Sequence, residues 1–186
     1  MRWPVETIFD LYPNRETIHP RRYGVIETGG GELRVVQLRA WPTLVSLPEL
    51  WPLGSRYHCR GNADRCFLYY NQPRRMPNFL ALKYVVSTSG TSYRTLRAAL
   101  AALDEIAAIK RIDAIVCDAG NIRLSNRFMA RLGWEPLAPQ RWHRNYIRRF
   151  YGVYPTRDSE AGVLAKPQAM IAAACCEDVP TAALSR

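Results

Sequence analysis

Residues 87–92 read Ser-Thr-Ser-Gly-Thr-Ser, and their types suit them to hold an anion. A helix is expected to start at the end of this run, because Thr91 or Ser92 can accept backbone N–H bonds as a cap. A helix N-terminus presents unpaired N–H groups and roughly half a positive charge. Small side chains let a phosphate approach the backbone, and Arg94 and Arg97 add positive charge. The run therefore predicts a phosphate site, against the alternative of a polar turn that only caps a helix.

Other residues with chemical potential are scattered along the chain. Asp118 ends an apolar segment and is a candidate to orient or deprotonate an amine, although an acid there is more often the cap of the next turn. Cys117 is interpreted as a buried small hydrophobe. The five cysteines form no CxxC pair, and the spacing of His58, Cys59 and Cys66 does not suit zinc. We therefore predict no metal, and the sequence has no Ser-His-Asp or Walker pattern.

Alternating apolar segments and turns must position these residues. Strands are expected at 23–28, 33–40, 66–71, 79–87, 112–117 and 140–154. Helices are expected at 91–111 and 123–132, with only a short helix between 41 and 54. Glycines 29–31 permit the positive φ angles of a hairpin turn between the first two strands. Residues 79–87, FLALKYVVS, are apolar at both alternating sets of positions, which predicts a central strand.

The segments from 79 to 118 form a strand-helix-strand unit. Leu96, Leu100 and Leu103 recur at helical spacing between the two strands. Such a unit makes its strands parallel, with a right-handed crossover. The fold class predicted is α/β, a mixed α+β sheet in which antiparallel N-terminal strands precede the βαβ unit, a short helix and a C-terminal strand. If strands 79–87 and 112–118 diverge, the backbone near residues 84–87 is exposed in a slot.

Three motifs in residues 79–151 resemble those of a known family. FLALKYVVS is similar to the central strand of the GNAT superfamily of acyl-coenzyme A N-acyltransferases, and the helix after it to the helix whose N-terminus receives the pyrophosphate. IDAIVCD, residues 112–118, resembles the following strand. Asn121 with RFMARLGWE, residues 127–135, resembles the family's closure of Asn, turn, helix, Gly and aromatic residue.

The resemblance implies a GNAT-like fold that takes acetyl-CoA or another acyl-CoA as co-substrate. The implied reaction is direct transfer of the acyl group to an amine on a small molecule or a protein. The slot would receive the pantetheine arm. The residues implied to contact the coenzyme are Val85, Ser87, Thr88, Ser89, Gly90, Thr91, Ser92, Arg94 and Asn121.

Two features depart from the family pattern. The phosphate loop of the family usually reads Gln/Arg-x-x-Gly-x-Gly/Ala, and its defining positions fall on Thr88, Thr91 and Tyr93. The tyrosine that often protonates the leaving thiolate falls on Met129, whose side chain has no proton to donate. A second hypothesis is therefore a catalytically degenerate GNAT-fold protein that binds a ligand or partner.

Residues 141–150 support a third hypothesis. Arginines interleaved with Trp142, Tyr146 and Phe150 are typical of a stacking platform for single-stranded nucleic acid. The formal net charge of +10 also favours phosphate ligands. Against this, aromatic residues in a terminal strand usually lie in a core or a dimer interface, and no RNA-binding signature occurs.

Length and composition set the outer limits. With 186 residues and 48% hydrophobic content, the chain has the size and composition of one globular domain. We assign this domain to 1–154, with an irregular arm over 1–22 and a poorly ordered tail over 155–186. No apolar run approaches the roughly 18 residues that span a bilayer, and the N-terminus lacks a signal peptide's apolar stretch. These patterns predict a cytoplasmic protein without membrane partners, either monomer or homodimer.

Overall fold

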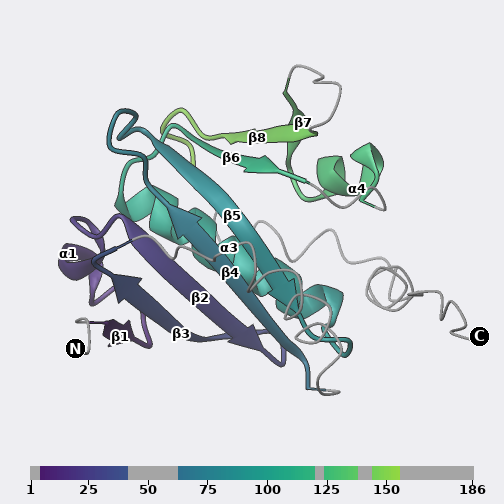
Figure 1. Ribbon diagram of the computed structural model, residues 1–186, viewed down its shortest axis with the longest axis horizontal. Helices are drawn as coiled ribbons and strands as arrows, with labels where there is room; N and C mark the ends of the chain where they lie inside the picture. The colour runs from purple at the N-terminus through teal and green to yellow at the C-terminus, as the bar shows by residue number, and fades with distance from the viewer. Residues whose placement is uncertain (1–4, 42–62, 120–123, 138–143, 156–186) are drawn as a thin grey trace, which may run out of the picture.

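The computed structural model describes residues 5–41, 63–119, 124–137 and 144–155. Its strands form one eight-stranded sheet in the order β1-β3-β2-β4-β5-β6-β8-β7 (Figure 1). The strands are β1 (Glu6–Ile8), β2 (Tyr23–Gly29), β3 (Glu32–Arg39), β4 (Arg65–Asn71), β5 (Phe79–Ser87), β6 (Ala114–Asp118), β7 (Glu135–Pro136) and β8 (Asn145–Arg149). The helices are α1 (Arg15–Ile18), α3 (Tyr93–Ile109) and α4 (Asn126–Arg131). In this sheet β5 and β6 pair in parallel and the other neighbours are antiparallel, which confirms the predicted mixed sheet.

The N-terminal strands form the expected hairpin. β2 and β3 pair antiparallel and are joined by Gly30 and Gly31, whose φ angles are 66° and 82°. These left-handed conformations favour glycine. The arm before β2, expected to be irregular, contains a short strand and a short helix. β1 pairs with the outer edge of β3, and Ile8, Leu11 and Ile18 of the arm are buried. Elements of three and four residues leave no periodic pattern in the sequence, which is why the arm was predicted to be irregular.

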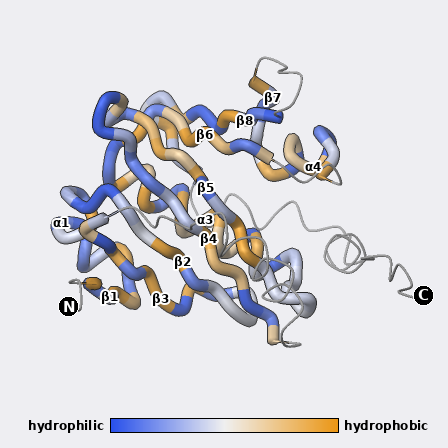
Figure 2. Tube along the Cα trace, in the orientation of Figure 1, coloured by the Kyte–Doolittle hydropathy of each residue, from blue (hydrophilic) through white to orange (hydrophobic). Residues whose placement is uncertain are grey.

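One face of the sheet packs on α3, the long helix. Thr28 of β2 faces this helix, since its Oγ1 donates to the Thr95 carbonyl at 3.0 Å. Alternate residues of the strands pack with α3 in one hydrophobic core. Figure 2 shows hydrophobic and hydrophilic segments alternating along the strands. The fully buried side chains of this core include Ile26, Val36, Leu38, Leu68, Leu80, Leu103, Ile106 and Ile115. The sheet and α3 thus form two layers around the core.

The expected central strand is β5, with the predicted bounds 79–87 and neighbours on both sides. Burial on both of its faces was also expected, but Leu80 and Leu82 are its buried residues and the rest are half-buried or exposed. Burial therefore falls off along the strand toward Ser87. The reason is that β6 lies beside only the first part of β5.

The C-terminal part of the fold is built around α4. Ser125 caps this helix by accepting from Phe128 N at 3.1 Å, and Gly133 ends it with φ 78°, as its C′ position predicts. β8 covers 145–149, the central part of the expected strand 140–154. Its C-terminal end comes before a turn in which Tyr151 and Gly152 have positive φ. The two-residue β7 was not predicted.

Several predictions concern residues outside the described ranges. They include the short helix between 41 and 54, His58, Cys59, Asn121, Trp142 and residues 156–186. Within the described ranges, no helix is both long and apolar enough to span a bilayer.

Candidate functional site

β5 and β6 diverge toward their C-terminal ends. Their parallel pairing runs from Phe79↔Ala114 to Leu82↔Cys117, and β5 then continues to Ser87 alongside β4 alone. Figure 1 shows the two strands separating beyond the shared stretch. The edge of β5 that faced β6 is therefore without a strand partner over residues 83–87, among the strands that the structure describes.

A β-bulge lies where the two strands separate. On β4, the adjacent residues Tyr69 and Tyr70 pair with Tyr84 and Leu82 of β5, so Lys83 is the extra residue. A bulge bends its strand and increases the local twist. Because the bulge follows directly on the last β5–β6 pair, it accounts for the divergence.

Val85 and Ser87 lie in the part of β5 that extends beyond its pairing with β6. Val85 pairs with Leu68 and Ser87 with Cys66, two residues of the core that packs on α3, so both lie on the α3 face of the sheet. Val85 is 40% exposed. An exposed aliphatic side chain on a strand edge without a neighbouring strand suits an arm with both amide and apolar segments.

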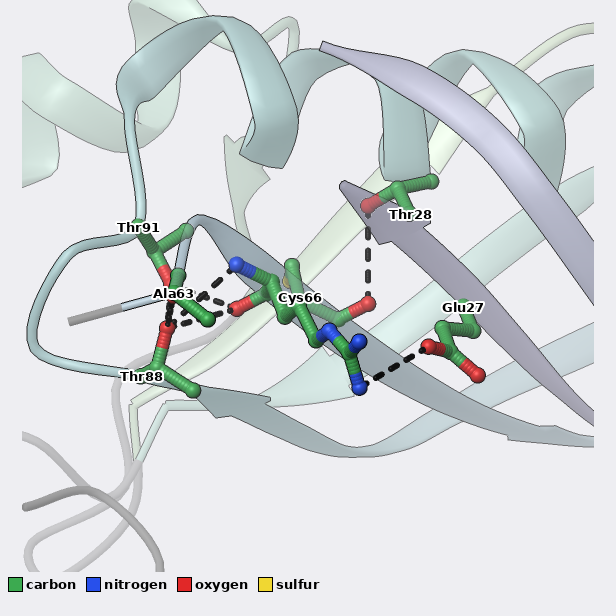
Figure 3. A network of polar contacts seen from close by, with 7 residues as sticks. Glu27, Thr28, Ala63, Cys66, Thr88 and Thr91 are labelled. Carbon is green, nitrogen blue, oxygen red and sulfur yellow. Dashed lines mark hydrogen bonds and ion pairs between the residues drawn. The ribbon is translucent and has the colours of Figure 1, made fainter. Parts of the chain in front are cut away.

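The turn after β5 is tied to the residues before β4. Thr88 Oγ1 donates to the carbonyl of Ala63, and Thr91 Oγ1 donates to the carbonyl of Arg65 at 2.5 Å. Thr88 N also donates to the Arg65 carbonyl, at 3.2 Å. Figure 3 shows Thr88 and Thr91 facing the backbone around Ala63. Both hydroxyl protons are thus committed inside the protein, although Thr88 and Thr91 are among the residues implied to contact the coenzyme.

The first residues of α3 form a second network around a carboxylate. Ser92 is the N-cap, one of the two predicted caps, and its Oγ accepts from Thr95 N at 3.1 Å. Asp64 accepts from Ser92 N at 2.8 Å, from Ser92 Oγ at 3.0 Å and from Thr95 Oγ1 at 2.7 Å. Burial alone would raise the pKa of Asp64, but hydrogen bonds from Ser92, Thr95 and Gly30 lower it below 3.8. A negative charge of the chain itself therefore lies at this helix end.

Ser89 and Gly90 are the remaining residues of the predicted phosphate loop. Ser89 is half-buried and Gly90 is exposed. Arg94 is exposed and packs against the β2–β3 turn, where a Cβ on Gly31 would collide with the Arg94 side chain. The ring of Tyr93 meets Phe128 of α4 edge-on, with 6.3 Å between ring centroids. The first turn of α3 is therefore in contact with α4.

Asp118 and Cys117 end β6 on the other side of the divergence. Asp118 is exposed and pairs in register with Asn145 of β8. Cys117 is half-buried, and burial together with the charge of Asp118 raises the pKa of its thiol to about 12. A thiol with this pKa is protonated at neutral pH, in keeping with its interpretation as a small hydrophobe.

Met129 lies inside the core. It is 6% exposed and packs in the same cluster as Phe128 and Leu132. Nearby, Tyr146 of β8 is also buried, and its hydroxyl donates to Asn126 Oδ1 at 2.7 Å. Met129 supplies no proton, and the phenol proton of Tyr146 is engaged with α4.

The basic, aromatic segment of β8 is used inside the fold. Arg148 Nη2 lies 2.6 Å from Asp104 Oδ2 of α3, and its Nη1 donates to the Leu132 carbonyl. Tyr146 and Phe150 are buried in the core. These aromatic rings cannot stack on bases in this arrangement, so the described part of the segment does not favour the nucleic-acid hypothesis.

Sequence reasoning missed two features of this site, Asp64 and the bulge at Lys83. Asp64 acts on Ser92, which is 28 residues away along the chain, and no local spacing links the two. The polar Lys83 within an apolar strand was the one visible sign of the bulge. Among the described residues, no cluster of three or more His, Cys, Asp or Glu side chains could hold a metal ion.

Comparison with known proteins gives one structural likeness. No protein-family model matches the chain, and no curated protein matches it. The chain is structurally similar to the crystal structure of nourseothricin acetyltransferase, with a TM-score of 0.38 and 11% sequence identity. The match covers 78% of this chain and 98% of that chain. The two proteins are thus highly divergent.

Proposed function

We propose that this chain is an acyl-CoA-dependent N-acyltransferase-like protein that transfers an acyl group from coenzyme A to an amine. The observation that carries the proposal is the divergence of β5 and β6 after Leu82 and Cys117. It leaves the last residues of β5 without a neighbour on that side among the described strands, at the C-terminal ends of two parallel strands. Ligands of open α/β sheets gather at such ends.

The pantetheine arm is proposed to lie along β5 between residues 84 and 87. Its amides would pair with the backbone along this edge, and its methylene groups would contact Val85. The pyrophosphate would lie beside Ser89 and Gly90 and the first turn of α3. Arg94 is exposed at this helix end and adds positive charge.

The chemistry proposed is a direct transfer. The amine nitrogen attacks the thioester carbonyl carbon, a C–N bond forms and the C–S bond breaks. The amine loses one proton and the leaving thiolate gains one. Asp118, exposed at the end of β6, is the candidate to orient the amine or take its proton. Positioning the two reactants together supplies much of the acceleration in such a reaction.

Calorimetry and thermal shift with acetyl-CoA and desulfo-CoA test the binding step. Desulfo-CoA lacks the sulfur and cannot carry an acyl thioester, so it reports binding without turnover. We expect heat and a raised melting temperature with both ligands. The absence of both signals at millimolar ligand would reject the proposal.

Gly90→Trp tests the position of the pyrophosphate. Gly90 is exposed, so the variant should fold while its side chain blocks the approach to the turn. We expect acetyl-CoA binding to be abolished. Met76→Trp is the matched control, because Met76 is 60% exposed in the turn before β5. Unchanged affinity of Gly90→Trp would show that the pyrophosphate binds elsewhere.

A second candidate function, acyl-CoA binding without catalysis, is favoured by Met129. A buried methionine stands at the position where the resemblance implies a proton donor. Thiol release from acetyl-CoA, followed with a panel of amines, separates the two functions. Binding without amine-dependent release would support the binding protein, and release that depends on one amine class would support the transferase.

A further inference from the structure

The carboxylate of Asp64 accepts hydrogen bonds from donors at the start of α3 that an anionic ligand would otherwise use. Both of its oxygens are engaged, Oδ1 with Ser92 N at 2.8 Å and Oδ2 with the hydroxyls of Ser92 and Thr95. The first N–H of the helix start and two nearby hydroxyl protons therefore point at a charge that belongs to the chain.

The backbone around Asp64 is fixed, so the contact is built into the fold. The carbonyl of Asp64 accepts from Gly30 N at 3.2 Å, which ties it to the β2–β3 turn. The carbonyls on either side of it, those of Ala63 and Arg65, accept the hydroxyl protons of Thr88 and Thr91. The side chain itself is half-buried and can leave the helix end by rotation without breaking these backbone bonds.

A pyrophosphate beside Ser89, Gly90 and the first turn of α3 would lie next to this carboxylate. Two like charges a few ångströms apart near a protein surface repel each other enough to change a binding constant by roughly tenfold. The carboxylate also offsets the partial positive charge of the helix end, which otherwise favours an anion.

We propose that Asp64 is an autoinhibitory contact, which competes with the pyrophosphate of the acyl-CoA for the N-terminus of α3. This inference rests on the proposed function, because it concerns the same ligand. Release requires the Asp64 side chain to turn away from Ser92 and Thr95. The lowered pKa of Asp64 keeps the group ionised at neutral pH, so a fall in pH within the physiological range does not relieve the inhibition.

Asp64→Asn tests the proposal, because asparagine removes the charge and keeps the cap. Its Oδ1 can still accept from Ser92 N, and its amide can donate to either hydroxyl. Asp10→Asn is the matched control. Asp10 Oδ1 also accepts a backbone N–H, from Tyr12 at 3.2 Å, in the N-terminal arm. The three proteins are titrated with acetyl-CoA and, separately, with inorganic pyrophosphate.

We expect Asp64→Asn to bind both ligands roughly tenfold more tightly than the unmodified protein at low ionic strength. The difference should shrink as salt is added. Asp10→Asn should bind like the unmodified protein. Equal or weaker binding by Asp64→Asn would overturn the inference. If none of the three proteins binds acetyl-CoA, the proposed function fails. The titrations with inorganic pyrophosphate then show by themselves whether Asp64 competes with an anion for the N-terminus of α3.

Discussion

Among single residues, those that carry a buried charge are expected to affect stability most when substituted. Asp104 of α3 and Arg148 of β8 form an ion pair with 4% and 12% of their side chains exposed. Arg148 also donates to the Leu132 carbonyl at the end of α4. One guanidinium group thus connects α3, β8 and α4.

Asp104→Asn should lower the free energy of unfolding by about 3–5 kcal/mol, because it removes the carboxylate charge that pairs with the buried guanidinium group of Arg148. Urea denaturation measures the change. Glu135→Gln is the control, since Glu135 pairs with Arg149 in a largely exposed position and should change stability by less than about 1 kcal/mol. Similar effects of both substitutions would contradict the assigned difference in burial.

Lys110 is a second buried charge, at the other end of α3. Its Nζ donates to the His19 carbonyl at 2.8 Å and to Gln72 Oε1 at 3.0 Å. Burial, followed by the charge of Arg22, lowers its pKa from 10.5 to about 8. The lowered value means that folding buries a charged ammonium below pH 8 and a neutral amine above it.

The ionisation of Lys110 should therefore contribute to the pH dependence of the unfolding free energy. Between pH 8 and 10.5 the unfolded chain holds a proton that the folded chain has lost, so this group makes folding more favourable as pH rises. We expect the difference in unfolding free energy between the unmodified protein and Lys110→Met to shift in favour of the unmodified protein over this range. Denaturation at several pH values checks it. A difference that is flat with pH would refute the shifted pKa.

At the level of elements, the edge of β5 beyond its pairing with β6 is the feature that the proposed function needs. Val85→Glu places a charge on this edge, beside the proposed path of the pantetheine arm. Because Val85 is 40% exposed, the melting temperature should change little, while acetyl-CoA affinity should fall at least tenfold. Val153→Glu, at an 81% exposed position after β8, is the matched control. Retained affinity in Val85→Glu would place the arm elsewhere.

The end of α4 gives a prediction about backbone geometry. Gly133 has φ 78°, and a Cβ there would lie 2.7 Å from Arg148 Nη1. Gly152 has φ 87° with open space around it. Gly152→Ala should cost about 1 kcal/mol for the left-handed conformation alone. Gly133→Ala should cost more, because it also displaces the buried guanidinium group. Thermal denaturation compares the two, and equal losses would mean that Arg148 moves without penalty.

At the scale of the whole molecule, periodic segments were predictable and contacts distant in sequence were not. The bounds of β5 and the start of α3 follow from an apolar run and a capping serine, both local signals. The parallel pairing of β5 with β6 follows from the helix between them. Asp64 belongs to the site only through the folded chain, because the strand that follows it brings it beside Ser92.

The basic C-terminal segment illustrates the same limit. Its alternation correctly places Tyr146 and Arg148 on one face and Ile147 on the other. The pattern could not reveal that Asp104, 44 residues earlier, neutralises Arg148. Without this partner the segment looked like a surface for nucleic acid, and with it the segment is part of the core that connects α3 to α4.

The extra residue at Lys83 also decides which side of the sheet each later residue of β5 faces. Strand residues alternate between faces with a period of two, so one added residue reverses the assignment of all that follow. Leu80 and Leu82 face α3, and after the bulge it is Val85 and Ser87 that do so, with Tyr84 opposite Tyr69 on the other face. Deleting Lys83 would remove the extra residue, while Tyr84 and Val85 keep their partners Tyr69 and Leu68 on β4 and therefore their faces. Such a deletion would thus straighten the strand and remove its local twist without changing which side chains line either face.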